Sequence, residues 1–241
     1  MIKLLWYSYF GIYLLIKSIV TKIDLFFLRE KSQEAIDELV YRRSKEISDH
    51  LLKKSKTISI VKGKENIPQG PCVFVSNHQA IFDCFLIYSN VCKLSGFIAK
   101  KEIKKYPLVS NWLNVMHSVY IDRKNVREGM KAINKGIENL KNGYSMIIFP
   151  EGTRSLESKM GEFKKGSMKL AIKANVPIVP ITVDGTYKVL EVGNKVRGNE
   201  VKIMIHEPVY VDKLSEEEKK NLSKILQDTI ENGLKDLNTL K

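Results

Sequence analysis

The chain has 241 residues, of which 44% are hydrophobic and 28% are charged, and this allows one sizeable α/β core with an accessory segment. The formal net charge of +13 is unusual and indicates a polyanionic partner: nucleic acid, an anionic membrane surface or a phosphorylated substrate. The three cysteines, Cys72, Cys84 and Cys92, have neither CxxC nor zinc-site spacing, which argues against a disulfide frame and favours reduced thiols of a cytosolic protein.

An apolar and aromatic segment opens the chain. Residues 4–16 are mostly apolar, Lys17 interrupts the run, and apolar residues resume as far as Leu28. A spanning helix needs about 20 mainly apolar residues, more than this run offers, and no small-residue cleavage site of a secretory signal follows. The aromatic residues favour the headgroup boundary, and Lys3, Lys17 and Lys22 can extend toward anionic phosphates. This pattern predicts an interfacial, half-inserted helix. A buried packing helix of a soluble domain is the alternative.

The next segment, 31–54, is highly charged and carries apolar residues at near-helical spacing. It predicts an amphipathic helix that folds back against the first one to form a helical pair. We therefore expect a membrane-interfacial helical segment over residues 1–54 and an α/β domain over residues 55–241.

Strands alternate with helices beyond residue 55. The predicted strands are 57–61, 72–75, 97–99, 119–121, 146–149, 178–183 and 201–205. The predicted helices are 81–91, 108–113, 126–141 and 216–237. Ser215 and Glu218 form a capping box before the last helix. This alternation predicts the α/β class, with a mostly parallel central sheet covered by helices.

A histidine and an aspartate stand where a predicted strand meets a predicted helix, in Asn77-His78-Gln79-Ala80-Ile81-Phe82-Asp83. Ligands of open α/β sheets lie outside the carboxyl ends of the strands, so His78 faces the expected site. From the first turns of the helix, Asp83 can reach the Nδ1 proton and leave Nε2 free as a general base. A structural histidine is the alternative, because short motifs often match by chance.

A second motif, Phe149-Pro150-Glu151-Gly152-Thr153-Arg154-Ser155, ends another predicted strand. Gly152 permits a positive φ or a close backbone approach. Arg154 presents a planar fork that suits a phosphate. A solvated basic loop is the alternative.

Two further segments complete the set. Asp122 and Arg123 follow the predicted strand 119–121, and a surface ion pair is the alternative there. Residues 176–181 hold two prolines around a short apolar strand, which indicates an architectural role beside the site.

Together these segments resemble the sequence blocks of the glycerophospholipid acyltransferases. His78 and Asp83 fit the HxxxxD motif, residues 149–155 fit the FPEGTRS block residue for residue, Arg123 fits the end of the strand–Arg block, and residues 176–181 fit the VPxxP block. All four occur in the order of the family. The resemblance covers residues 57–210. Within the family, the sequence most resembles the members that acylate 1-acyl-sn-glycerol 3-phosphate (lysophosphatidate) to phosphatidic acid.

The sequence departs from the family pattern at two positions. His117 stands where the second block usually begins with glycine, which bears on the local turn and on the fit of the acceptor. Ala80 stands where the family commonly has a small hydroxyl residue. Neither position belongs to the catalytic pair.

The resemblance implies direct acyl transfer without an acyl-enzyme, from acyl-CoA or an acyl carrier protein, with no metal and no cofactor. The absence of a GxSxG elbow agrees with this. His78 is implied to deprotonate the sn-2 hydroxyl, and Asp83 to orient it. Backbone N–H groups near the helix start are the expected oxyanion donors. The implied binding residues, for the acceptor phosphate and for the shape of the loop, are Arg123, Arg154, Lys100, Lys101, Glu151, Gly152 and Thr153.

The expected partners are lysophosphatidate, the acyl donor and an anionic membrane surface, with the protein peripheral or monotopic on the cytoplasmic face. Glycerol 3-phosphate or another lysophospholipid is the alternative acceptor. A hydrolase that uses water at the same site is a further alternative, but it explains the basic loops less well than a lipid acceptor does. A nucleic-acid-binding module would fit the charge, but no RNP, KH, helix-turn-helix or zinc pattern supports it, so no nucleic acid is expected. A non-catalytic membrane-surface adaptor is the remaining alternative.

Overall fold

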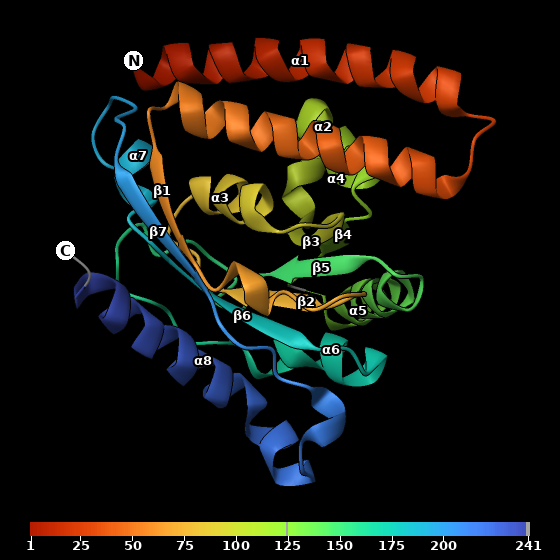
Figure 1. Ribbon diagram of the computed structural model, residues 1–241, viewed down its shortest axis with the longest axis vertical. Helices are drawn as coiled ribbons and strands as arrows, with labels where there is room; N and C mark the ends of the chain where they lie inside the picture. Colours follow the sequence, from red (N-terminus) through yellow and green to blue (C-terminus); the bar gives the residue numbers. More distant parts are fainter. Residues whose placement is uncertain (124, 240–241) are drawn as a thin grey trace.

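A computed structural model of the protein describes residues 1–123 and 125–239, and it has three layers (Figure 1). A central sheet has helices α1 to α4 on one face and α5, α6 and α8 on the other. The helices are α1 (Lys3–Leu28), α2 (Gln33–Lys54), α3 (Phe82–Asn90), α4 (Pro107–Val115), α5 (Val126–Lys141), α6 (Lys169–Ala174), α7 (Tyr187–Leu190) and α8 (Glu216–Thr239). Short 3-10 helices are η1 (Lys64–Asn66), η2 (Lys101–Lys105), η3 (Lys165–Met168) and η4 (Val211–Lys213).

Within the described residues the sheet has seven strands in the order β1-β7-β6-β2-β5-β3-β4. They are β1 (Ile58–Lys62), β2 (Val73–Ser76), β3 (Ser95–Lys100), β4 (Val119–Ile121), β5 (Ser145–Ile148), β6 (Ile178–Asp184) and β7 (Glu200–Ile205). Every neighbouring pair is parallel except β6 and β7. The predicted α/β class with a mostly parallel sheet is confirmed.

The sheet separates two hydrophobic cores because successive strand residues point to opposite faces. In β2, Phe74 packs in the core under α1 to α4, whereas Val73 and Val75 pack in the core under α5 and α8. The neighbouring strand β5 divides in the same way, with Ile147 on the first face and Met146 on the second. Strands buried on both faces form short, nearly continuous apolar runs, and this fixes the positions of the loops that follow them.

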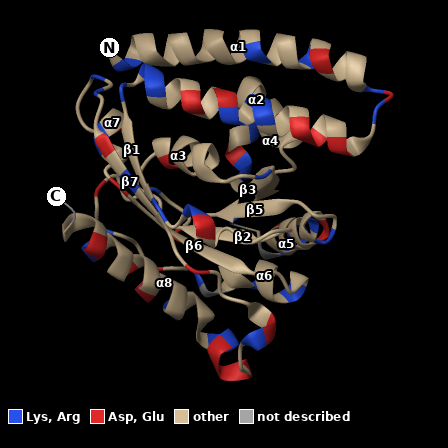
Figure 2. Cartoon of the chain, viewed as in Figure 1, with Lys and Arg blue, Asp and Glu red and all other residues tan. Residues whose placement is uncertain are grey.

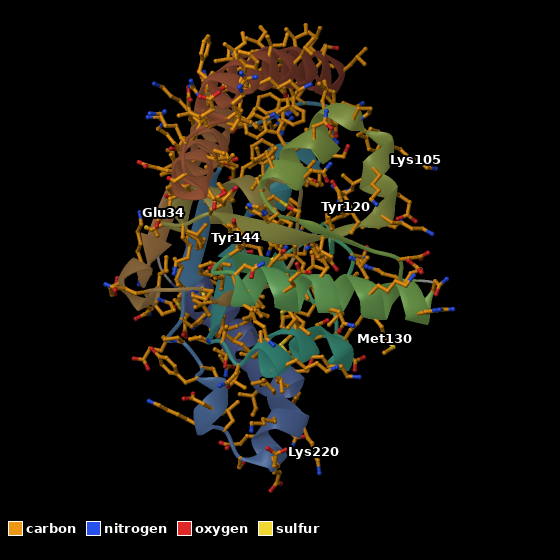
Figure 3. All side chains as sticks on the ribbon, turned by 90° about the vertical axis from the view of Figure 1, so that its right-hand side faces the viewer. Glu34, Lys105, Tyr120, Met130, Tyr144 and Lys220 are labelled. Atoms are coloured by element: carbon orange, nitrogen blue, oxygen red, sulfur yellow. The ribbon has the colours of Figure 1, made fainter. Side chains whose placement is uncertain are left out.

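Strand β4 forms one edge of the sheet, and a tyrosine side chain on it bonds to α4. The Tyr120 hydroxyl donates to the carbonyl of Ser110 and lies 3.0 Å from Oδ1 of Asn114, both on α4. Figure 3 shows Tyr120 beside α4 and Met130 on α5. These bonds hold β4 at the sheet edge next to β3.

The first helix is apolar on both sides and packs only one of them. Trp6 and Leu14 are 3% and 4% exposed and belong to the core above the sheet. The opposite face is open, with Leu4 74%, Ile12 62% and Phe27 76% exposed. Charged residues are sparse along α1 and dense along α2 (Figure 2). Among the described residues, no helix combines the length and apolar character required to span a membrane.

The helical pair shares a core with the rest of the chain. The rings of Trp6 and Phe82 lie 5.8 Å apart, and the indole N–H of Trp112 donates to the Ser18 hydroxyl. Leu51 of α2 is fully buried in the same cluster. The domain boundary between residues 54 and 55 stays a prediction.

Candidate active site

The sequence motifs lie at the carboxyl ends of parallel strands. His78 follows β2, and residues 149–155 follow β5, which pairs directly with β2. Arg123 follows β4, two strands further along the sheet. Parallel strands bring their following loops to one edge of the sheet, so this topology gathers the motifs at that edge.

Asp83 is fully buried and receives several donors. Its Oδ2 accepts from Nδ1 of His78 at 2.7 Å and from the backbone N–H groups of Gln79 at 2.6 Å and Ala80 at 2.8 Å. The Thr186 hydroxyl donates to Oδ1. Because a carboxylate only accepts, Nδ1 of His78 carries the hydrogen and Nε2 is left with a lone pair. His78 can therefore act as a general base whose ring is oriented by the Asp83 carboxylate.

The imidazole of His78 is held between the two motif loops. Its ring stacks on Phe149 with centroids 3.9 Å apart, and its side chain is 17% exposed. The backbone N–H of His78 donates to Oε1 of Glu151 at 2.6 Å, and the carbonyl of His78 accepts from the N–H of Ser155 at 2.8 Å. These bonds fix the position of the base relative to the second motif.

The buried side chain of Glu151 connects its own loop to the loop that holds His78. Its Oε2 accepts from the N–H of Gly161 at 2.7 Å, while Oε1 serves His78. Burial raises the pKa of Glu151, and the N–H donors of Gly161 and His78 act in the opposite direction. Both carboxylate oxygens are thus engaged by the protein itself.

Three of the backbone N–H groups near the start of α3, where oxyanion donors are expected, already have acceptors within the protein. The N–H groups of Gln79 and Ala80 donate to Asp83, and that of Ile81 donates to Oε1 of Glu191 at 3.0 Å. The aspartate therefore satisfies the same backbone groups that a helix start would offer to an anion.

A basic pocket lies beside Gly152, which has a φ of 74°. A Cβ atom at this glycine would stand 2.8 Å from Nζ of Lys164 and 3.2 Å from Nη1 of Arg123. The cavity has a volume of about 240 Å³, and Phe149 also lines it. Burial lowers the pKa of Arg123, and no salt bridge joins its guanidinium to a carboxylate within residues 1–123 and 125–239. Gly152 thus leaves room for two cationic side chains to converge beside the cavity, and this arrangement suits a phosphate.

The other predicted binding residues are dispersed. Nη1 of Arg154 donates to Oε1 of Glu191 at 3.0 Å, and the arginine side chain is 46% exposed. Lys101 pairs with Asp122, whereas Lys100 is 56% exposed and lies 3.6 Å from Glu102. Thr153 is exposed on the loop.

Sequence reasoning did not single out Glu191 or Thr186. Both lie outside the four blocks, on either side of α7, and they reach the site only through the fold. Lys164 follows the second motif, but only the structure brings it to Gly152.

The departure at His117 has a conformational reason. Its φ is 58°, in the left-handed region where glycine carries no steric cost, and this accounts for the usual glycine of the family. Stacking on Tyr144 at 3.7 Å and a bond from Asn139 to its carbonyl at 2.6 Å hold the residue in that conformation. Nε2 lies 3.3 Å from Oδ1 of Asp37.

Among the described residues, no cluster of three or more His, Cys, Asp or Glu side chains is placed to hold a metal ion.

The sequence matches the family model described as acyltransferase over residues 59–184. The 1-acyl-sn-glycerol-3-phosphate acyltransferase of Borreliella burgdorferi is 36% identical over 186 residues, which cover 76% of this chain and 72% of that protein. The chloroplastic enzyme BAT2 of Brassica napus is 36% identical over 157 residues, 64% of this chain, and the match spans only 45% of the length of that relative.

A crystal structure with the same fold is the 1-acyl-sn-glycerophosphate (LPA) acyltransferase PlsC from Thermotoga maritima. It superposes with a TM-score of 0.87 at 29% sequence identity and covers 99% of this chain and 95% of that one.

Proposed function

The chain belongs to the acyltransferase family, and on this premise we propose that it is a 1-acylglycerol-3-phosphate O-acyltransferase. It transfers a fatty acyl group from a thioester to the sn-2 hydroxyl of 1-acyl-sn-glycerol 3-phosphate and gives phosphatidic acid for phospholipid synthesis. The observation that carries the proposal is the pairing of His78 with Asp83, which leaves Nε2 of His78 unprotonated at the strand ends. The names of the relatives support the choice of acceptor.

In the proposed reaction, Nε2 of His78 takes the proton of the sn-2 hydroxyl as the oxygen attacks the thioester carbonyl. The new C–O bond forms, the C–S bond breaks, and the thiolate takes the proton back from the imidazolium. Asp83 keeps Nδ1 protonated and stabilises the positive ring between the two steps. No covalent acyl-enzyme is required.

The acceptor phosphate binds at the pocket beside Gly152, between Arg123 and Lys164. Arg154 contributes from the same loop, two residues after Gly152. Charge-assisted bonds from guanidinium and ammonium groups suit a phosphate dianion. Of the remaining predicted residues, Lys100 and Lys101 add positive charge at the end of β3, and Glu151, Gly152 and Thr153 shape the loop.

The acyl donor is acyl-CoA or an acyl carrier protein, and the chemistry draws on no cofactor. The protein works at the cytoplasmic face of a membrane as a peripheral or monotopic protein. The open apolar face of α1 supports this location, because exposed apolar area of this kind favours the boundary between headgroups and acyl chains.

The acceptor is tested by supplying the purified protein with one acyl-CoA and three acceptors in separate vesicle assays: lysophosphatidate, glycerol 3-phosphate and lysophosphatidylcholine. Lysophosphatidate should be acylated fastest, and mass spectrometry should identify phosphatidic acid. A preference for lysophosphatidylcholine, which lacks a free phosphate monoester, would contradict the role of the basic pocket.

A further inference from the structure

Glu191 follows α7 and connects two parts of the active site that lie far apart in sequence. Its Oε1 accepts from the N–H of Ile81 and from Nη1 of Arg154, both at 3.0 Å. The side chain is 9% exposed, and Oε2 is buried without a hydrogen bond among the described residues. A single carboxylate oxygen therefore accepts from the turn after His78 and from the arginine of the second motif.

The backbone around Glu191 is well anchored. Its N–H donates to the carbonyl of Tyr187 at 3.1 Å, and its own carbonyl accepts from Nζ of Lys3 at 3.3 Å. Val189 is fully buried, and Thr186 at the start of α7 bonds to Asp83. One short helix thus positions the partner of Arg154 and the partner of Asp83.

Arg154 needs such a partner. Its side chain is 46% exposed, and fixing a freely moving arginine side chain on a ligand costs rotamer entropy. The bond to Glu191 engages Nη1 and leaves the other guanidinium N–H groups for an anion. Pre-orientation of this kind lowers the cost of binding.

We propose that Glu191 is a positioning residue that fixes the guanidinium of Arg154 for binding to the phosphate of the acceptor. This inference rests on the proposed function. It concerns a residue outside the sequence blocks, and it assigns to Glu191 an effect on acceptor binding that is exerted through Arg154.

The test is a double-mutant cycle of Glu191→Gln, Arg154→Ala and the double variant. Gln keeps an oxygen for the Ile81 N–H but removes the charge that pairs with Arg154. Glu138→Gln is the control, because Glu138 pairs with Lys135 at 2.9 Å on the exposed surface of α5. Initial rates are measured with varied lysophosphatidate and, separately, with varied acyl-CoA.

Glu191→Gln should raise the KM for lysophosphatidate about tenfold, the effect of roughly one lost charge-assisted bond, and leave kcat and the KM for acyl-CoA within about twofold. On the Arg154→Ala background the same change should have no further effect, because coupled residues are not additive. If Glu191→Gln melts at a lower temperature than the wild type, Glu191→Asp is used in its place. Asp retains the charge with a shorter reach and should show a smaller rise in the KM for lysophosphatidate.

Three results would each overturn the proposal: an unchanged or lower KM for lysophosphatidate, a fall in kcat with equal rises in both KM values, or full additivity with Arg154→Ala. Failure of the wild-type protein to acylate lysophosphatidate would instead overturn the proposed function. The two failures are therefore distinguishable.

Discussion

The open face of α1 should bind membranes mainly through its apolar side chains. We predict that Leu4→Gln, Ile12→Gln and Phe27→Gln together release the protein from vesicles. These side chains are 74%, 62% and 76% exposed, so their replacement leaves the core intact. Burying each in the bilayer contributes about 1.5 kcal/mol, and the three together about 4.5 kcal/mol. The partition coefficient should therefore fall about a thousandfold.

The lysines of α1 should contribute less than the sequence suggests. Lys17 pairs with Glu46, and Nζ of Lys3 is bonded to the carbonyl of Glu191, whereas Lys22 is exposed. A free lysine near an anionic surface contributes about 1 kcal/mol, and salt screens this term. High salt should therefore weaken vesicle binding only modestly.

The assay is sedimentation with anionic liposomes at low and high salt. The matched control replaces three residues of similar exposure elsewhere: Ile58→Gln, Tyr106→Gln and Met130→Gln, at 67%, 65% and 62%. Deleting residues 1–28 is unsuitable because it would remove Trp6 and Leu14 from the core. If the α1 variant pellets like the wild type, or if the control variant is released equally, the assignment of α1 as the membrane-binding element fails.

Three further predictions concern the site and its stability. Asp83→Asn should lower kcat by about 10³-fold, because an amide no longer enforces the tautomer of His78, and it should also lower the melting temperature, because Asp83 is buried and accepts from four donors; a kcat near that of the wild type would contradict this. Arg123→Ala should raise the KM for lysophosphatidate about 10- to 100-fold, and an equal rise in the KM for acyl-CoA would argue against its role. Burial lowers the pKa of His206, which lies 2.7 Å from Thr182, so stability should be full above pH 6.5 and fall as the pH drops below it. His206→Gln should melt with a smaller difference between pH 7.5 and 5.5 than the wild type, and an equal or larger difference would refute this reasoning.

Much of the fold could be predicted because the signals are local. The helix 126–141 was predicted at the bounds of α5, and the Ser215–Glu218 capping box forms, with a bond of 3.2 Å from the N–H of Glu218 to the Ser215 hydroxyl. The helices α6 and α7 were missed because segments of six and four residues are too short to show a periodic apolar face. One face of the first helix packs in the core and the other is open, and its insertion into a membrane interface stays a prediction.

In the site, too, only contacts between residues close in the sequence could be predicted. His78 and Asp83 lie within one strand–helix junction, so their spacing alone predicted a bond that the structure has. Glu191 and Thr186 come from another part of the chain, and nothing in their own surroundings indicates the contact. The backbone N–H groups at the start of α3 were assigned to an oxyanion because sequence cannot show that Asp83 and Glu191 already accept from them.

The central claim is that His78 acts as the general base of a direct acyl transfer. The most direct measurement compares wild-type protein and His78→Ala in vesicles that contain lysophosphatidate and acyl-CoA, recording phosphatidic acid by mass spectrometry and free thiol by colorimetry. The wild type should release one thiol for each phosphatidic acid formed, and the variant, with an unchanged melting temperature, should be slower by about two to four orders of magnitude. Near-wild-type turnover in His78→Ala, or thiol release without phosphatidic acid, would contradict the account.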